Sequence, residues 1–160
     1  MTNFQAIIGR AEMLELVESG TKVPAKIDTG AFRSSIHCTE AKEVTKDGKK
    51  VLRVTLLGHP CAPETVTSDF AEYDRVTVTN SFGQQEVRYE IDLRVKMGSK
   101  IMTSSFTLAD RSKNLFPVLV GRKLLKHRFV VDVARSGLNR LQLKEHYGVT
   151  MPIDEEDIEE

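Results

Sequence analysis

One short stretch of the sequence joins an apolar segment to a carboxylate, a hydroxyl and a glycine, in the order Asp28-Thr29-Gly30. A preceding strand would fix the height of the carboxylate, and Gly30 would let the backbone pass close beneath it. Thr29 is β-branched, so its hydroxyl can be aimed at the backbone or at a twin of the same turn. Such a turn can support activation of water by a carboxylate, although Asp-Thr-Gly is also an ordinary turn after a strand.

A second stretch, far downstream, favours the catalytic interpretation. Three apolar residues, 118–120, precede Gly121, which opens a predicted helical segment at Arg122. In retroviral-type aspartic peptidases, an apolar run and a glycine follow the Asp-Thr-Gly-Ala turn at long range and support it from behind. This sequence resembles that order, so we expect Val120, Gly121 and Arg122 to support the turn at Asp28.

The chain as a whole resembles the bacterial retropepsin-like proteins that are often labelled ATP-dependent zinc proteases. The segments that carry this resemblance are residues 7–10, 25–31, 34–38, 88–89, 110–112, 117–125 and 129–133. The resemblance implies the barrel fold of the retroviral acid proteases and an aspartic endopeptidase activity. Some members of that group are associated with ATP-grasp ligases that add glutamate to proteins, which implies a peptide substrate with an acidic tail.

Hydrolysis by this route requires two carboxylates that share a proton around one water molecule. The sequence contains a single Asp-Thr-Gly, and Asp47-Gly48 lacks the hydroxyl residue. The second carboxylate would therefore be Asp28 of another copy across a twofold axis. We predict a homodimeric peptidase with Asp28, Thr29 and Gly30 as catalytic residues. A non-catalytic module that binds a peptide or an acidic partner would show the same turn, and a metal-dependent peptidase is a weaker alternative.

Four further residues are candidates for substrate contact. Ala31 and Arg33 follow the turn directly, and Arg33 would favour an acidic substrate. Arg88 and Tyr89 lie on the return arm of a predicted hairpin whose tip, at residues 80–83, would form a flap over bound peptide. The pair could bind a substrate carboxylate or backbone, or could simply decorate a strand face.

The alternation of apolar and polar residues predicts an all-β chain. We expect strands or hairpins at residues 6–18, at the segment ending in Asp28, and at residues 34–38, 44–56, 75–95, 101–108 and 129–133. Residues 58–70 are expected to form a loop and residues 122–127 a helix. The predicted fold is a small closed β barrel with one short helix near the C-terminus. We predict a single retropepsin-like domain at residues 1–150 and an acidic, disordered tail at residues 151–160.

The composition narrows the classes of partner. The 160 residues, 40% of them hydrophobic, suit one core. Residues 151–160 contain six acidic residues and no Lys or Arg, so the rest of the chain is basic, with 23 basic and 17 acidic residues. A peptide or protein substrate, preferably acidic, fits this charge. We expect no membrane association, because no apolar run approaches the roughly 18–20 residues of a span. Scattered lysines and few aromatics indicate no nucleic-acid binding.

Metal and cofactor motifs are absent from the sequence. The candidate ligands are His37, Cys38, His59, Cys61, His127 and His146. They form neither His-Glu-x-x-His nor a pair of Cys-x-x-Cys, and neighbouring residues of a strand, such as His37 and Cys38, point to opposite faces. The sequence also lacks a Gly-x-x-x-x-Gly-Lys-Ser/Thr phosphate loop. We therefore expect no metal and no other cofactor, and the two cysteines favour a reduced, cytoplasmic protein.

Overall fold

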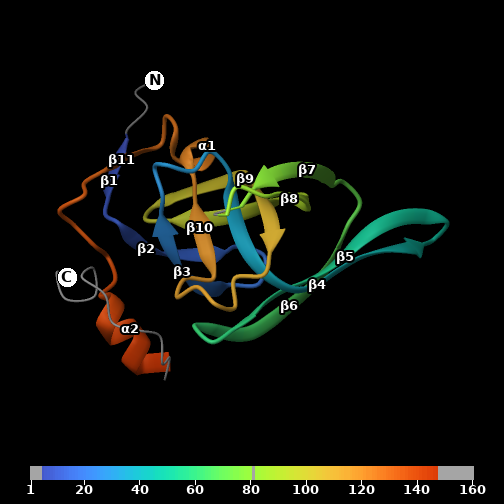
Figure 1. The fold of residues 1–160 in the computed structure, drawn as a ribbon, viewed down its shortest axis with the longest axis horizontal. Helices are drawn as coiled ribbons and strands as arrows, with labels where there is room; N and C mark the ends of the chain where they lie inside the picture. Colours follow the sequence, from blue (N-terminus) through green and yellow to red (C-terminus); the bar gives the residue numbers. More distant parts are fainter. Residues whose placement is uncertain (1–4, 81, 148–160) are drawn as a thin grey trace.

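The computed structural model describes residues 5–80 and 82–147, which consist mostly of strands (Figure 1). The strands are β1 Ala6–Ile8, β2 Ala11–Leu16, β3 Thr21–Ile27, β4 Ser34–Lys46, β5 Lys49–His59, β6 Ala62–Phe70, β7 Asp74–Thr79, β8 Gln85–Met97, β9 Lys100–Ala109, β10 Val118–Val120 and β11 Phe129–Val131. The helices are α1 Arg122–Leu125 and α2 Arg140–Tyr147. The predicted tail at residues 151–160 lies outside the described residues.

Six of these strands close into a barrel. The order around it is β10, β3, β2, β8, β9 and β4, and β4 pairs again with β10. The short strand β10 closes the ring because it runs parallel to β3, with Val120 opposite Ile27, and antiparallel to β4, with Leu119 opposite Ser35. The prediction of a closed all-β barrel is therefore confirmed.

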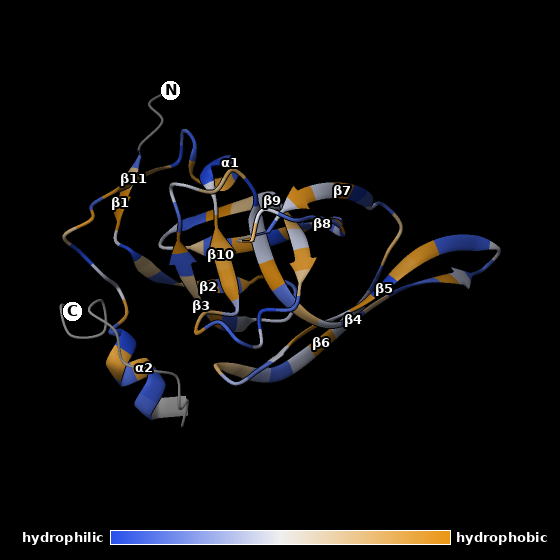
Figure 2. Ribbon diagram, viewed as in Figure 1, coloured by the Kyte–Doolittle hydropathy of each residue, from blue (hydrophilic) through white to orange (hydrophobic). Residues whose placement is uncertain are grey.

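Apolar side chains from the barrel strands fill its interior. Among the most deeply buried are Leu14, Val23, Ile36, Ile91 and Phe106, each at most 1% exposed. Burial of one such side chain stabilises the fold by roughly 1.5–3 kcal/mol relative to leaving it in water. The hydrophobic bands on the barrel strands are visible in Figure 2, and they follow the period-two alternation that predicted the strands.

The sheet continues beyond the barrel as an arm formed by β5, β6 and the distal part of β4, which projects to one side in Figure 1. Asp47 and Gly48 form its tip with φ of 51° and 76°, the conformation of the predicted two-residue turn. The loop predicted at residues 58–70 is wrong, because β6 covers Ala62–Phe70 and pairs with β5. This edge strand is largely exposed on both faces and therefore shows no apolar alternation.

The described residues contain two helices, one more than the prediction. α1 ends at Leu125, before the predicted end at residue 127, where His127 adopts a φ of 68° that turns the chain. α2 begins after Asn139, whose Oδ1 accepts the N–H of Gln142 at 2.9 Å. Leu143 of α2 packs against a small second cluster that includes Leu115. Its few apolar residues give this eight-residue helix a weak signal in the sequence.

β10 and α1 support the turn that follows β3. The Asp28 N–H donates to the Val120 carbonyl at 2.9 Å, and the Gly121 N–H donates to Oγ of the buried Ser34 at 3.0 Å. A Cβ atom on Gly121 would lie 2.6 Å from the Arg33 carbonyl oxygen. Gly121 has an extended backbone with φ of −98°, so the requirement for glycine here is steric. The chain can pass this close to the turn only without a side chain.

Two buried histidines hold the loop between β9 and β10, with ring centroids 5.2 Å apart in an edge-to-face arrangement. His37 Nδ1 accepts the Arg111 N–H at 2.8 Å. His59 Nε2 lies 2.9 Å from the Arg111 carbonyl oxygen and 2.8 Å from that of Asn114, and its Nδ1 accepts the Cys61 N–H at 3.0 Å. These partners require a neutral His59 with its proton on Nε2. The main chain of Arg111 is thus held on both sides.

Burial lowers the pKa of both imidazoles, and the neighbouring His59 lowers that of His37 further. The Asp110 carboxylate lies 3.8 Å from His37 Nδ1. That nitrogen already accepts the Arg111 N–H, so the contact with Asp110 is not an ion pair in the neutral form. Both histidines therefore act as uncharged hydrogen-bonding groups in the folded protein.

Replacing Gly121 with Ala should lower the free energy of unfolding by roughly 1–3 kcal/mol, because the new Cβ must displace the Arg33 backbone. Urea unfolding measures the change. Gly30→Ala is a matched control, since its Cβ would meet only one side-chain atom, Asp28 Oδ1, at 3.1 Å, and no backbone atom. Equal unfolding midpoints for Gly121→Ala and the unaltered protein would contradict the steric argument.

Lowering the pH from 7 to 5 should reduce the free energy of unfolding. The unfolded chain protonates His37 and His59 near pH 6.5, whereas the folded chain does so only at lower pH, so stability present above pH 6.5 is lost below it. Glu43 and Asp69 have pKa values of about 2 in the folded protein, so their protonation lowers the free energy of unfolding only below the ordinary carboxylate pKa, outside this pH interval. Urea unfolding at stepped pH tests this, and a flat profile between pH 7 and 5 would count against it.

Candidate active site

Asp28 follows β3 directly, and its carboxylate is folded back over its own turn. Oδ1 accepts the Gly30 N–H at 2.9 Å, and the Asp28 carbonyl accepts the Ala31 N–H at 3.3 Å. Among the described residues, Oδ2 has no hydrogen-bond partner. Asp28 is half-buried, whereas Thr29 and Gly30 are exposed. The turn therefore fixes the orientation of the carboxylate and leaves one of its oxygens available to a water molecule.

The three residues predicted to support the turn all lie against it. The Val120 carbonyl accepts the Asp28 N–H, and Gly121 passes behind the turn as described above. The Arg122 N–H donates to the Ala31 carbonyl at 2.8 Å, and its Nη1 donates to the Thr29 carbonyl at 3.1 Å. The backbone of the turn is thus bound to β10 through the Asp28 N–H and to α1 through the Thr29 and Ala31 carbonyls.

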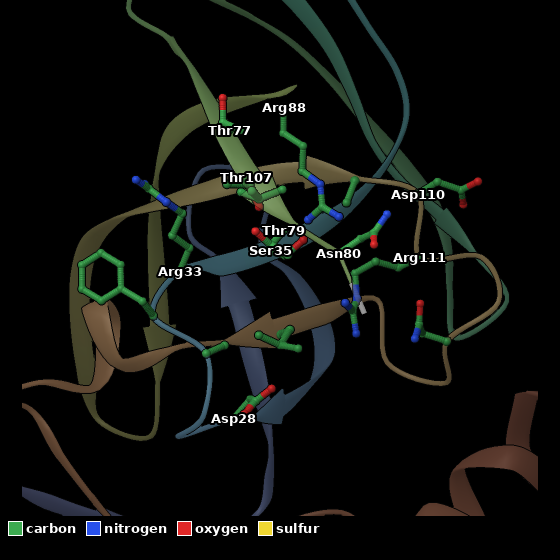
Figure 3. A pocket seen from close by; sticks show the side chains of 16 residues that line it. Asp28, Arg33, Ser35, Thr77, Thr79, Asn80, Arg88, Thr107, Asp110 and Arg111 are labelled. Atoms are coloured by element: carbon green, nitrogen blue, oxygen red, sulfur yellow. The ribbon is translucent and has the colours of Figure 1, made fainter. Parts of the chain in front are cut away.

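Asp28 lines an open cavity of about 650 Å³ (Figure 3). Its walls come from the Asp28 turn, the start of β4, the β7–β8 hairpin, the end of β9 and the β9–β10 loop. Besides Asp28, the lining includes Ala31, Ser35, Thr79, Arg88, Thr107 and Arg111. A cavity of this size lies in the range that binds small molecules or a few residues of a peptide.

The β7–β8 hairpin borders the cavity at the position expected of a flap. Thr77, Val78, Thr79 and Asn80 line the cavity from this hairpin. The side chain of Asn80 shapes the tip, because its Oδ1 accepts the N–H groups of Phe82 and Gln84 at 2.9 and 3.0 Å. Closure of the hairpin over a bound peptide stays a prediction.

Three arginines line the cavity, and their charges are compensated to different degrees. Nη1 of Arg33 lies 2.7 Å from Oε2 of Glu90, which is buried. Arg88 forms an ion pair with Glu86 on its own strand. Arg111 forms no ion pair with any residue that the structure describes. The predicted Arg33 is therefore already neutralised within the chain, whereas the charge of Arg111 faces the cavity without a partner.

Arg111 is the cavity residue that sequence reasoning missed. Burial lowers the pKa of its guanidinium to about 10, with Arg88 lowering it further and Asp28 raising it, so Arg111 stays charged at neutral pH. Its Nε donates to the Phe116 carbonyl at 2.9 Å. Residues 110–112 do carry part of the family resemblance, but only the histidine contacts, across 52 and 74 residues of sequence, bring Arg111 to the cavity.

Tyr89 is not among the residues that line the cavity. Its hydroxyl donates to Glu43 at 3.2 Å, and its ring packs edge to face on Tyr73 with centroids 5.9 Å apart. Hydrogen bonds from Tyr73 and then Arg75 are the main causes that lower the pKa of Glu43 to about 2. Neighbours on a strand point to opposite faces, so the structure brings Arg88 but not Tyr89 to the cavity.

The buried histidines and the two cysteines do not fit a zinc ion. Among the side chains that the structure describes, in residues 5–80 and 82–145, no three of His, Cys, Asp or Glu are placed to hold a metal. Both ring nitrogens of His59 and one of His37 already bind backbone groups. Burial raises the pKa of the Cys38 thiol and raises that of Cys61 to about 11, so neither is a ready thiolate. No helix in the described part of the chain is long and apolar enough to cross a membrane.

Two curated relatives are larger proteins that contain a segment similar to this chain. One from Desulfotalea psychrophila, named "Probable alpha-L-glutamate ligase", is 29% identical over 132 residues, which cover 80% of this chain and 28% of the relative. Another of the same name, from Shewanella pealeana, is 26% identical over 157 residues, covering 93% and 34%. The chain thus spans about a third of the length of these relatives.

A solved structure and a family model also match most of this chain. The crystal structure of the Legionella pneumophila protein Lpg0085, described as of unknown function, has a TM-score of 0.66 and 29% identity, covering 83% of this chain and 97% of that one. The model of the RimB-like family, described as "Retropepsin-like aspartic endopeptidase RimB", matches residues 7–142. Because that match includes the Asp28 turn, β10 and the cavity between them, the chain belongs to the RimB-like family of retropepsin-like aspartic endopeptidases.

Proposed function

We propose that the protein is a homodimeric aspartic endopeptidase in which Asp28 of each copy activates water for peptide-bond hydrolysis. The observation that carries this proposal is the Asp28 carboxylate, oriented by the Gly30 N–H at 2.9 Å on the border of an open cavity. The family match over residues 7–142 supports the same chemistry. Thr29 and Gly30 shape the turn, and Val120, Gly121 and Arg122 keep it in place.

The reaction divides the work between the two Asp28 carboxyl groups. Two carboxylates this close share one proton, because both cannot ionise easily. The ionised Asp28 removes a proton from the bound water, whose oxygen attacks the scissile carbonyl carbon. The protonated Asp28 of the other copy donates its proton to the carbonyl oxygen. When the carbon–nitrogen bond breaks, the leaving nitrogen takes up a proton from the first carboxyl group. One hydroxyl of the tetrahedral intermediate returns its proton to the second carboxylate as the new carboxyl group forms, which restores the starting state.

The dimer is supported by features around the turn and at the β1–β11 pair. Thr29 is exposed, and its hydroxyl has no hydrogen-bond partner among the described residues, which leaves it available to a second copy of the turn. Ile7 of β1 and Val130 of β11 are cross-strand neighbours and are 56% and 47% exposed. Neighbouring exposed apolar side chains of this kind suit a subunit interface.

The substrate we propose is a peptide or protein with acidic residues, handled in the cytoplasm. Arg111, which has no ion-pair partner among the described residues, gives the cavity a positive side beside Asp28. Relatives that contain a similar segment are named as glutamate ligases, which is consistent with a substrate that bears glutamates. Two unbridged cysteines, Cys38 and Cys61, suit a reducing compartment.

A non-catalytic peptide-binding module is the second candidate, and one observation favours it. Asp110 is the other carboxylate on the cavity wall, but it points away from Asp28 in Figure 3 and its side chain is 79% exposed. A chain that never dimerises would therefore keep a cavity and lack the second acid. Such a monomer could hold a peptide without cleaving it.

Asp28→Asn should reduce cleavage of a peptide library by about 10²–10⁴-fold, because the amide cannot accept the proton of water. The change is nearly isosteric, so the fold and the dimer should persist, as checked by circular dichroism and sedimentation. Asp47→Asn, at the arm tip, is the matched control and should keep full activity. Cleavage that survives Asp28→Asn would rule out the aspartic mechanism.

Introducing charge at the β1–β11 pair should separate the subunits and remove activity together. We expect Ile7→Lys and Val130→Lys to shift sedimentation equilibrium towards monomer, with specific activity recovering as protein concentration rises. Ile101→Lys on β9, at an equally exposed apolar position of 52%, is the control and should not change the assembly. A monomeric variant that cleaves peptide at full rate would overturn the need for two copies.

A further inference from the structure

The cavity wall contains a buried hydroxyl, that of Ser35, which is unpaired within the described part of the chain. Ser35 lines the cavity and is 6% exposed, yet its Oγ has no hydrogen-bond partner among the described residues. Buried polar atoms are nearly always paired in native proteins, so the Ser35 hydroxyl calls for a partner that the described residues do not supply, and its place on the cavity wall puts that partner in the cavity. Ser35 lies at the start of β4, in the centre of the view in Figure 3.

The guanidinium of Arg111 is the second unsatisfied group in the same cavity. Only its Nε has a protein acceptor, the Phe116 carbonyl, and within the described residues no carboxylate pairs with it. Arginine offers a planar fork of donors that matches a carboxylate in two parallel hydrogen bonds. In Figure 3 the side chains of Arg88 and Arg111 enter the cavity from different walls, and Arg88 lowers the pKa of Arg111.

Arg111 is also held in place before any ligand arrives. Its N–H is bound by His37 and its carbonyl by His59, both through main-chain atoms, and its Nε is tied to Phe116. A side chain held in this way loses little conformational freedom on binding, which strengthens a charge-assisted contact. By contrast, Arg33 is already paired with the buried Glu90 and has no charge to spare.

We infer that Arg111, with the Ser35 hydroxyl, forms a subsite for a carboxylate side chain of the substrate, beside Asp28. This inference rests on the proposed peptidase function and adds where the acidic residue is bound. In a twofold dimer the subsite occurs once in each copy, on either side of the paired Asp28 residues. An extended substrate should then place one acidic residue on each side of the scissile bond, at similar distances from it.

Binding is tested in the Asp28→Asn protein, which should hold peptide without cutting it. The probes are fluorescent ten-residue peptides of Ala and Ser that carry either two Glu or two Gln residues at varied spacing. Arg111→Gln should raise the Kd for the best Glu peptide roughly ten- to a hundredfold and leave that for its Gln counterpart unchanged.

Two further variants serve as controls for this change in Kd. Arg111→Lys should keep part of the preference for the Glu peptide. Arg94→Gln, outside the cavity, should change neither Kd. All the anchors of Arg111 except that at Nε are main-chain groups, so these variants should fold.

Cleavage by the protein with Asp28 intact tests independently whether there is one carboxylate subsite on each side of the scissile bond. Product sequencing should show Glu favoured over Gln on both sides of the cut, and Arg111→Gln should remove both preferences together. Equal losses for Glu and Gln peptides, or a preference on one side only, would overturn the inference while cleavage remains. If no peptide is cut but binding still depends on Arg111, the peptidase proposal fails and the carboxylate subsite stands.

Discussion

The insertion of β10 between β3 and β4 is the contact on which the rest of the structure depends. It closes the barrel, and it places the Val120 carbonyl against the Asp28 N–H at the point where β3 ends. The next residue, Gly121, passes so close to the turn that no side chain fits. Closure of the fold and support of the carboxylate are therefore a single event, and a change that loosens one must loosen the other.

The cavity contains a charged arginine, whereas the loop that positions it is held by two neutral histidines. His37 and His59 are kept neutral by burial so that they can bind the main chain of Arg111. Arg111 itself stays charged although it is partly desolvated beside Arg88. A partly buried charge without an ion-pair partner destabilises the fold, and a bound ligand of opposite charge can offset that loss. The neutral histidines fix the main chain of Arg111, and the hydrogen bond from its Nε to the Phe116 carbonyl holds the side chain.

The local chemistry of the site was predictable, and the contacts made through distant segments were not. Residue type and order were enough to predict the turn at Asp28-Thr29-Gly30 and its support by Val120-Gly121. No local motif predicts that Arg111 lines the cavity, because its position depends on contacts with His37 and His59, which are far away in the sequence. β6 escaped detection since a two-sided, exposed edge strand shows no alternation. Tyr89 was grouped with Arg88 by adjacency, although a strand sends neighbours to opposite faces.

The distance along the chain between β3 and β10 also sets an order of events during translation. The segment that carries the acid leaves the ribosome about ninety residues before the strand that braces it. Because domains form their long-range pairings only once both partners have emerged, a nascent chain displays the acid on an unbraced loop. The contacts of β10 and α1 with the Asp28 turn can therefore form only after synthesis has passed α1.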